Sequence, residues 1–393
     1  MKEIILLKSG EIALKGLNRG SFEDMLIKNC KSALKDLGEF RFLKAQSTTF
    51  VEPAGDCDMA EALERLSRVF GIAALCRARV AEKDYAALEE AAAEYLGREL
   101  LSARTFKVAA KRSDKRFPLN SPQICEKLGA FLLGRFPHLR VDVESPDVLV
   151  TVEIRDFAAY LHGRQIPGAG GIPVSSSGRG MLLLSGGIDS PVAGVMMAKR
   201  GLSISAIHFH TPPYTSERAL YKVKRLAGIM TRYCGTIPLF IVPFTKISEQ
   251  IRELCPEQLS TIIMRRFMMR IADRMAQRDD CGALITGESV GQVASQTLPS
   301  LACTQEGLSL PVLRPAVGMD KEEIVSLSRK IGAFETSVEP FDDCCVVFTP
   351  RHPKTKPKLE EIIRAEEALD QGALILEALD GIEKVLIRNF AGC

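Results

Sequence analysis

The chain of 393 residues is 46% hydrophobic and 26% charged, with a formal net charge of +3, which is typical of a soluble globular protein with two or three domains. No apolar run approaches the ~20 residues of a membrane span, and the N-terminal stretch MKEIILLKSG lacks the pattern of a signal peptide. The eleven cysteines show no C-x-x-C spacing, so the pattern predicts neither a zinc site nor a secreted disulfide framework. We therefore expect a cytoplasmic protein with no membrane partner.

Strands and helices alternate through the first 165 residues. EIILL near the N-terminus predicts a strand, and residues 21–38 place apolar side chains on one helical face that ends at Gly38. The elements expected next are a strand pair around 40–52, a helix at about 58–70, a strand at 72–81, a helix at 84–100, a strand at 104–111, a helix opened by Ser121 and Pro122, and strands at 147–154 and 158–163.

A stretch rich in glycine, proline and serine, GRQIPGAGGIPVSSSGRG at 163–180, predicts a linker or flexible loop and marks a domain boundary. Beyond it the pattern is that of a parallel sheet. Strands are expected at 181–184, 203–209, 238–243 and 283–286, with helices at about 191–200, 216–233 and 257–278. This order predicts an α/β, doubly wound sheet whose ligand lies at the carboxyl ends of the strands, where the stretches 185–190, 208–210 and 285–297 should meet.

The stretch MLLLSGGIDSPVAG, residues 181–194, suggests what that ligand is. A buried strand is followed by Gly186 and Gly187, which allow backbone angles that other residues resist, and Pro191 suits the first turn of a helix. A strand, a glycine turn and a helix N-terminus together favour an anion site. The turn is neither a G-x-x-x-x-G-K-[ST] loop nor a G-x-G-x-x-G loop.

SGGIDSP resembles the pyrophosphatase-loop signature S-G-G-x-D-S of enzymes that cleave ATP to AMP and pyrophosphate. Together with KSGEIALKGLNRGSFE, ITGESVGQVASQTL, PVLRPAVGMDKEEI and EPFDDCCVVFTPRHPKTKP, it resembles the tRNA 4-thiouridine synthase (tRNA uracil 4-sulfurtransferase) family from end to end. The resemblance implies a ferredoxin-like domain at 1–58, a THUMP RNA-binding domain at 59–165, a linker at 166–180 and a pyrophosphatase-loop catalytic domain at 181–393. Because the chain stops at Cys393, we expect a short form without the rhodanese domain of the longest members.

The resemblance implies adenylation of uridine O4 in tRNA, at position 8, followed by displacement of AMP by a cysteine persulfide. It implies ATP contacts at Leu183, Leu184, Ser185, Gly186, Gly187, Asp189, Ser190, His208, Phe209, Arg265, Gly287 and Gln296. Among these, Phe209 would flank the adenine, Gly287 would let the backbone approach it, and Arg265 would meet phosphate.

Two charged residues are expected to act with the nucleotide. Asp189 is the predicted Mg²⁺ ligand, with the alternative that it only caps the helix near Pro191. Lys321, in GMDKEEI, would neutralise phosphate charge, with the alternative of an exposed lysine in a first helical turn.

Sulfur delivery requires a cysteine that can carry a persulfide. Cys345 aligns best with the family's cysteine, and its neighbour Cys344 is the candidate resolving thiol. Acidic neighbours would raise a thiol pKa here and basic neighbours would lower it, so the thiol's reactivity stays open. The other nine cysteines are expected to be buried and inert.

A basic stretch, RTFKVAAKRSDKR at 104–116, carries the candidate RNA contacts Lys107, Lys111, Arg112, Lys115 and Arg116. A second basic stretch is RHPKTKPK at 351–358. For each, the alternative is a solvated charged face.

The expected partners are tRNA, a cysteine desulfurase as sulfur donor and a thiamine-pathway sulfur-carrier protein, and a homodimer is left open. Two other classes also remain open. Another pyrophosphatase-loop synthetase, acting on tRNA or forming an amide, is one, although no glutaminase segment is visible. An RNA-binding protein regulated by a nucleotide is the other.

Overall fold

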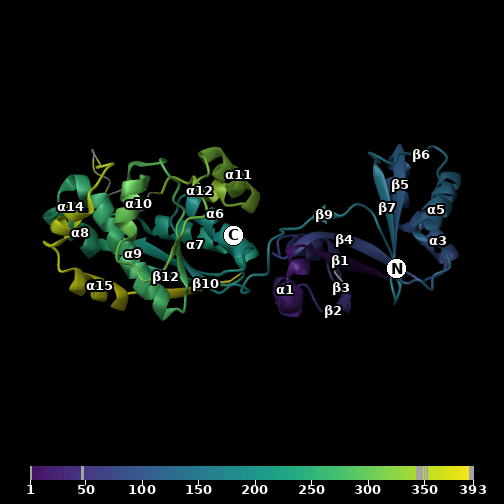
Figure 1. Cartoon of the computed structure of the whole chain (residues 1–393), viewed down its shortest axis with the longest axis horizontal. Helices are drawn as coiled ribbons and strands as arrows, with labels where there is room; N and C mark the ends of the chain where they lie inside the picture. The colour runs from purple at the N-terminus through teal and green to yellow at the C-terminus, as the bar shows by residue number, and fades with distance from the viewer. Residues whose placement is uncertain (1, 46–47, 342–347, 349, 351–352, 389–393) are drawn as a thin grey trace. The chain divides into compact units, whose positions relative to one another are not determined.

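The computed structural model describes residues 2–45, 48–341, 348, 350 and 353–388 (Figure 1). The chain divides into two compact units, Met1–Ile172 (unit 1) and Pro173–Cys393 (unit 2), and each is taken by itself below. The division falls within the stretch 166–180 that was expected to be a linker. Among the described residues, no helix is both long and apolar enough to cross a membrane.

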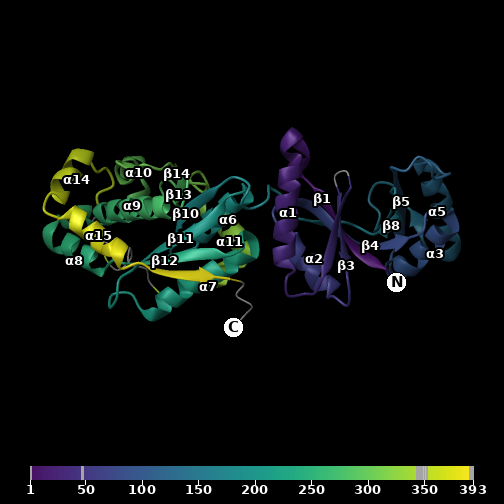
Figure 2. The ribbon, with the colours of Figure 1, turned by 90° about the horizontal axis from the view of Figure 1, so that it is seen from below.

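The first part of unit 1 pairs four antiparallel strands in the order β2-β3-β1-β4. Its elements are β1 (Glu3–Ser9), η1 (Glu11–Leu14), η2 (Gly16–Asn18), α1 (Arg19–Ala33), β2 (Phe40–Ala45), β3 (Thr48–Pro53), α2 (Met59–Ser67) and β4 (Ile72–Ala81). Buried residues of α1 and α2, among them Leu26 and Leu66, pack on one face of this sheet with Ile5 (Figure 2). The predicted strand pair and the strand at 72–81 are confirmed.

The second part of unit 1 continues the same sheet through β8, β7, β5 and β6. Its elements are α3 (Tyr85–Tyr95), α4 (Gly97–Ser102), β5 (Thr105–Arg112), α5 (Ser121–Arg135), β6 (Arg140–Val141), β7 (Val148–Ile154), β8 (Ala159–His162) and β9 (Ile166–Pro167). Helices α3 and α5 lie on one side of β5 and β7 (Figure 1), around Phe106 and Ile124.

One prediction for this part is wrong in detail. The single helix expected at 84–100 is two helices, because the backbone of Leu96 (φ −101°, ψ 5°) leaves helical geometry. Helix α5 begins at Ser121 and Pro122 as predicted, and its cap is Asn120. The Asn120 Oδ1 atom accepts from the Gln123 N–H over 3.0 Å, and the Gln123 side chain accepts from the Asn120 N–H, which forms a capping box.

A buried ion cluster ties β1 to β7 and β8. Glu153 of β7 is fully buried, and its carboxylate lies 2.7 Å from both Lys8 Nζ and Arg155 Nη2 and 3.6 Å from His162 Nε2. Burial alone would raise the pKa of Glu153, but these cations hold it well below its usual range. Burial alone would lower the pKa of His162, whereas Cys76 and Glu153 raise it to about 9. Each charge of this cluster has an opposite charge beside it.

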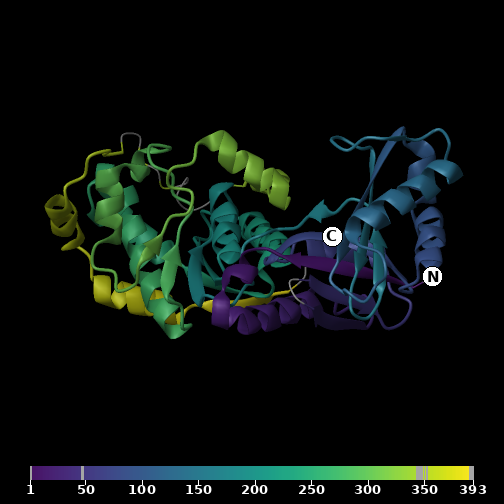
Figure 3. The same ribbon diagram turned by 45° about the vertical axis from the view of Figure 1, so that its right-hand side comes forward.

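Unit 2 contains a six-stranded sheet in the order β14-β13-β10-β11-β12-β15. Its strands are β10 (Arg179–Leu183), β11 (Ser203–His210), β12 (Ile237–Pro243), β13 (Ala283–Ile285), β14 (Val312–Leu313) and β15 (Glu383–Ile387). Five strands are parallel, four of them predicted, whereas β14 was not predicted. Strand β15, which pairs antiparallel with β12 at the sheet edge, was not predicted either (Figure 3).

Helices cover both faces of this sheet, which confirms the doubly wound prediction. They are α6 (Asp189–Lys199), α7 (Glu217–Cys234), α8 (Thr245–Leu254), α9 (Ser260–Arg278), α10 (Leu298–Gln305), α11 (Lys321–Ile331), α12 (Phe334–Ser337), α14 (Leu359–Glu366) and α15 (Gln371–Asp380), with short 3₁₀ turns η3 (Glu257–Leu259) and η4 (Ala294–Gln296). Met181 of β10 belongs to the core cluster built on α8 and α9, whereas the next residue, Leu182, lies against Gly194 of α6. Successive side chains of β10 thus enter layers on opposite faces.

Candidate active site

Loops at the carboxyl ends of the parallel strands share one edge of the sheet in unit 2. Strand β10 leads into residues 184–188, β11 into 211–216, β13 into the 286–297 loop and β14 into 314–320. Neighbouring strands pair in parallel, so these four segments leave the sheet at the same edge. The stretches predicted to meet around one ligand are therefore neighbours, and residues 314–321 join them.

Two serine hydroxyls close the turn between β10 and α6, here called the Ser185–Ser190 turn. The Ser185 N–H donates to Ser190 Oγ over 3.0 Å, and the two hydroxyl oxygens lie 3.1 Å apart. Neither Gly186 nor Gly187 has the positive φ that the sequence suggested. Among the described residues, a Cβ on Gly187 would approach only the Ser185 hydroxyl, at 3.4 Å. The glycine thus leaves space at the N-terminus of α6, where an anion is favoured.

Asp189, the first residue of α6, is held by two side chains from distant parts of unit 2. Lys321 Nζ lies 2.8 Å from its Oδ1 atom, and Gln292 Nε2 donates to Oδ2 over 3.0 Å. The helix-cap alternative is wrong, because the N-cap position is Ile188 and the Asp189 side chain makes no capping bond. Lys321 is not an isolated surface lysine, although its side chain is about half exposed. A carboxylate and a cation thus lie side by side where α6 and α11 begin.

Gly287 brings the 286–297 loop against the start of α6. A Cβ at this position would lie 2.7 Å from the Asp189 carbonyl carbon and 2.7 Å from the Ser190 nitrogen, so only glycine fits. The structure gives this glycine a reason that the sequence did not suggest, which is the close approach of the first turn of α6. Gln296 is buried, and its Oε1 atom accepts from the Ser289 N–H over 3.4 Å. Its side chain braces the same loop.

Glu288, the next residue of this loop, is a buried carboxylate bound by two arginines. Arg265 Nη2 donates to its Oε1 atom, and Arg314 Nε donates to Oε2 over 2.7 Å. Thr286 Oγ1 also donates to Oε2, over 2.8 Å. Burial by itself would raise the pKa of Glu288, but the two guanidinium groups outweigh it and lower the pKa below its usual value.

Sequence reasoning missed Glu288, Arg314 and Gln292. All three lie in stretches that were singled out for their resemblance, and each follows a parallel strand. The rule that ligands bind at the carboxyl ends of such strands was the signal that could have found them.

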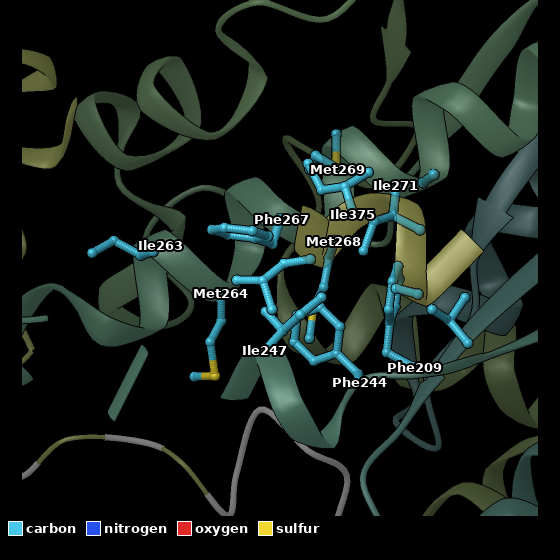
Figure 4. Close-up of a cluster of buried hydrophobic side chains, with 14 of the residues drawn as sticks. Phe209, Phe244, Ile247, Ile263, Met264, Phe267, Met268, Met269, Ile271 and Ile375 are labelled. Carbon is cyan, nitrogen blue, oxygen red and sulfur yellow. The ribbon is translucent and has the colours of Figure 1, made fainter. Parts of the chain in front are cut away.

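Of the candidate ATP contacts on and directly after β10 and on β11, all but Leu183 have buried side chains. The Phe209 ring packs in the core against Phe244, with ring centroids 5.2 Å apart (Figure 4). His208 Nδ1 lies 3.0 Å from the Leu184 carbonyl oxygen, and Leu184 is buried while Leu183 is half-buried. A ring buried in this way does not flank an adenine, so a contact of Phe209 with a nucleotide would come from its backbone.

The basic candidates in unit 1 fall into two groups. Three of the five form hydrogen bonds within the protein. Arg112 Nη1 donates to the carbonyl oxygens of Phe117 and Leu119 over 3.0 and 3.3 Å. Lys107 Nζ donates to the Val143 carbonyl oxygen over 2.9 Å, and Arg116 Nε donates to Asp114 Oδ1 over 3.0 Å. The alternation of β5 turns Arg112 toward the helix-covered face, because Phe106 and Val108 on the same side pack in the core there.

The other two candidates, Lys111 and Lys115, are exposed. Neither forms a hydrogen bond or an ion pair with another residue in the described part of the chain. Their ammonium groups are therefore available to a phosphate backbone, whereas the Arg112 guanidinium is engaged internally.

Cys344 and Cys345 lie outside the described residues. Before them, Lys222 Nζ donates to the Glu339 carbonyl oxygen over 2.8 Å, and after them the Phe348 ring packs on the Tyr214 ring, with centroids 5.0 Å apart. Lys222 belongs to α7 and Tyr214 to the loop between β11 and α7. The described residues on both sides of the cysteine pair are thus tied to the segment that follows β11.

Eight other cysteines are described, and the expectation that they are buried is wrong for two of them. Cys57 and Cys125 are half-buried, and the other six are buried. Burial raises the pKa of Cys30, Cys234 and Cys281 to about 12. These three thiols are poor nucleophiles at neutral pH.

Comparison with known proteins extends over the whole chain. Residues 175–371 match the family described as "Thiamine biosynthesis protein (ThiI)", residues 4–76 match the ThiI ferredoxin-like domain, and residues 82–162 match the THUMP domain. The probable tRNA sulfurtransferases of Acetivibrio thermocellus and Alkaliphilus oremlandii are 49% and 47% identical to the chain, with 98% of it covered in each case and 99% and 98% of their own lengths.

Two solved structures agree with this result. One, described as a 4-thiouridine synthetase–RNA complex with bound ATP, has a TM-score of 0.91 and 33% identity, covering 99% of this chain and 100% of that one. PH1313 from Pyrococcus horikoshii Ot3 has a TM-score of 0.65 at 23% identity, over 84% of this chain and 99% of its own, which shows a shared fold alone. With near half of its residues identical to those relatives along almost its full length, the chain belongs to the ThiI family of tRNA sulfurtransferases.

Proposed function

We propose that this protein uses ATP to transfer sulfur to a uridine of tRNA, at position 8, and so forms 4-thiouridine. The observation that carries the proposal is the convergence at one sheet edge of the Ser185–Ser190 turn, the Asp189–Lys321 pair and Arg265 beside Glu288. An anion-binding turn flanked by cations suits a triphosphate. The likeness to a 4-thiouridine synthetase that binds RNA and ATP supports the same reaction.

In the first half-reaction, uridine O4 attacks the α-phosphorus of ATP, and the bond from that phosphorus to the pyrophosphate oxygen breaks. Negative charge grows on the departing pyrophosphate, where backbone N–H groups at the start of α6 can stabilise it. Lys321 and Arg265 supply positive charge at the same edge. The carbonyl oxygen, a poor leaving group, has then become part of an AMP ester.

Magnesium is the expected companion of ATP, and the residues present fit an ion that arrives with the nucleotide. The described residues contain no group of three or more acidic, histidine or cysteine side chains arranged to hold a metal. Asp189 is a partly exposed carboxylate beside the anion-binding turn. Mg²⁺ is usually bound by one or two carboxylates together with substrate phosphates and water. We assign the carboxylate ligand to Asp189, where a bound Mg²⁺ would neutralise phosphate charge.

In the second half-reaction we assign the sulfur carrier to Cys345. The terminal sulfur of its persulfide attacks C4 of the uridine, and AMP leaves with the former O4. The Cys344 thiolate then attacks the Cys345 sulfur, so that the S–S bond breaks and the outer sulfur stays on the base. This leaves a Cys344–Cys345 disulfide, which an external dithiol must reduce. The contacts of the flanking residues with α7 and with the loop between β11 and α7 support delivery of sulfur near the nucleotide edge.

Partners follow from this chemistry. A cysteine desulfurase would supply the persulfide sulfur, and Lys111 and Lys115 would contact tRNA phosphates. The family description supports a second use of the sulfur in thiamine synthesis, through a sulfur-carrier protein. A tRNA substrate supports a cytoplasmic location, and a homodimer stays open.

Mass spectrometry of tRNA after incubation with ATP, Mg²⁺ and sulfide tests the proposed function. Replacement of one oxygen by sulfur at a single uridine is the expected result. Pyrophosphate release from ATP without any thiolated tRNA would favour another pyrophosphatase-loop synthetase. Binding of tRNA with neither product would favour a nucleotide-regulated RNA-binding protein.

The Cys345→Ser variant separates the two half-reactions. With a desulfurase as donor, it should still release pyrophosphate but form no 4-thiouridine, because serine cannot carry a persulfide. Cys344→Ser is the matched variant. Because Cys344 is assigned as the resolving thiol, an added reductant should restore 4-thiouridine formation in this variant by breaking the S–S bond in its place. Full thiolation by Cys345→Ser with the desulfurase would contradict the persulfide route and leave direct attack by sulfide.

A further inference from the structure

We infer that Arg314 is a second phosphate-binding cation of the nucleotide site and that Glu288 is the positioning residue that holds Arg314 and Arg265 together. The three side chains are called the Glu288 cluster below. The inference rests on the proposed use of ATP and adds to it two residues, both fully described by the structure.

Charge is the first argument. Glu288 is 3% exposed and carries one negative charge, while the two arginines on its carboxylate carry two positive charges. If Arg265 were the only partner, the carboxylate would neutralise it and leave little attraction for phosphate. Arg314 supplies the second cation, so the cluster keeps one net positive charge in a site with little water. An excess charge in such surroundings favours binding of an anion.

Unused donors are the second argument. Arg265 Nε and Arg314 Nη2 are buried, and within the described part of the chain neither has a hydrogen-bond partner. Leaving a buried N–H without an acceptor costs free energy, so such groups are rare unless a ligand uses them. Guanidinium groups present several N–H donors in a fixed plane, which matches phosphate oxygens. Both orphan donors sit on arginines of the same carboxylate.

Position is the third argument. Glu288 directly follows Gly287, which touches the backbone of Asp189 and Ser190. Arg314 directly follows β14, the neighbour of β13, and the Thr286 N–H donates to the Leu313 carbonyl oxygen over 3.1 Å. The cluster therefore stands beside the Ser185–Ser190 turn, at the edge where phosphate is expected.

A second cluster in unit 2 provides a matched control. Glu366 is 1% exposed and also binds two arginines of α9, with Arg266 Nε at 2.8 Å and Arg270 Nη2 at 3.0 Å. Neither Arg266 nor Arg270 has a buried nitrogen without a partner among the described residues. The Glu366 cluster resembles the Glu288 cluster in burial and composition but lacks its unused donors.

The experiment measures binding of a non-hydrolysable ATP analogue, AMPPNP, to the full-length protein without tRNA, by calorimetry, with adenosine as the second ligand. We expect Arg314→Met to weaken AMPPNP binding by about tenfold or more, since a cation and its charge-assisted hydrogen bond to phosphate are lost. Glu288→Gln should weaken AMPPNP binding by a similar factor although it raises the net positive charge, because both arginines lose the carboxylate that holds them in place. Adenosine binding should stay within about twofold, because adenosine has no phosphate. Arg314→Lys, which keeps the charge but not the planar fork, should fall between wild type and Arg314→Met.

The control variant Glu366→Gln should bind AMPPNP as the wild type does, at a temperature where every variant is folded by circular dichroism. Unchanged AMPPNP affinity in both Glu288→Gln and Arg314→Lys would overturn the inference, as would an equal loss in Glu366→Gln. The binding assay contains no tRNA, so wild-type protein that binds AMPPNP but never thiolates tRNA would contradict the proposed function and not this inference.

Discussion

Two adjacent arginines of α9 show how differently one helix can use the same side chain. Arg266 is 1% exposed and fully engaged: its Nε donates to Glu366, its Nη1 to the Cys303 carbonyl oxygen and its Nη2 to Glu306 at 2.9 Å. Arg265 donates through Nη2 to Glu288, has only a 3.5 Å contact from Nη1 to Ser295 and leaves Nε without a partner among the described residues. Successive helical residues point about 100° apart, so one arginine enters the interior and the other the sheet edge.

The comparison indicates that the role of a charged side chain depends on whether its N–H donors are saturated, which means that they already have partners within the protein. A saturated charge, such as Arg266, stabilises the fold, and its loss takes one of two partners from a buried carboxylate. A charge with donors to spare, such as Arg265, Lys111 or Lys115, can act on a ligand. The four predictions below test this division in both units.

The largest effect is expected for Asp189→Ala. We expect pyrophosphate release in the presence of tRNA to fall about 100- to 1000-fold, as for loss of one electrostatic contact to a charged transition state. Affinity for tRNA should not change, because we assign tRNA binding to residues 1–165.

The control for this variant is Asp370→Ala, which removes a carboxylate outside the candidate site whose side chain caps α15 by accepting from the Ala373 N–H over 3.0 Å. Its activity should be unchanged, and its stability lower by about 1 kcal/mol. A fall in tRNA affinity as large as the fall in activity for Asp189→Ala would contradict our domain assignment.

A second test replaces the two neighbouring arginines with methionine, one at a time. Arg266→Met should lower the free energy of unfolding by about 3 kcal/mol, because the buried Glu366 carboxylate loses one of its two arginine partners. Arg265→Met should cost less stability but weaken ATP binding. Chemical denaturation measures the stability of both variants, and nucleotide titration measures their affinity for ATP. Equal losses of stability and of ATP affinity in the two variants would contradict the different roles given to Arg265 and Arg266.

In unit 1 the same division separates lysines of one basic stretch. Replacing Lys111 and Lys115 together with alanine should weaken tRNA binding and reduce its salt dependence by about one to two units, because each phosphate contact releases counterion. Lys107→Ala, which removes an internally bonded lysine, is the matched control. The measurement is tRNA binding by both variants from low to moderate salt. An unchanged slope for the double variant would make this stretch a solvated face.

The last prediction concerns pH and the buried Glu153 cluster. The pKa of His162 is raised from 6.5 to about 9 in the folded protein, so its contribution to stability is fully present below about pH 6.5 and is lost as pH rises through 9. Between these values stability should fall by at most about 1.4 kcal/mol per pH unit. Denaturation of wild type and His162→Asn from pH 6 to 9 measures this. Parallel curves of unfolding free energy against pH for the two proteins would refute the contribution assigned to His162.

Much of the architecture can be predicted from local patterns. The buried run 181–184, the glycine pair at 186–187 and Pro191 predict a strand, a turn and a helix, and the structure has all three. Such features depend on residues close together in the chain, whose backbone preferences act whatever the rest of the protein does. The parallel order of strands and helices is likewise visible in their spacing.

What the sequence by itself determined is therefore the kind of many of the elements and the sheet edge at which we place the proposed site. Only the tertiary structure decided which charges meet: Asp189 and Lys321 are 132 positions apart, and Arg266 and Glu366 are 100 apart. It also decided that the Phe209 ring is buried, that Arg112 is engaged internally and that β15 closes the sheet antiparallel. The physical reason is that strand order and register bring distant segments together, whereas propensity and periodicity act over a few residues.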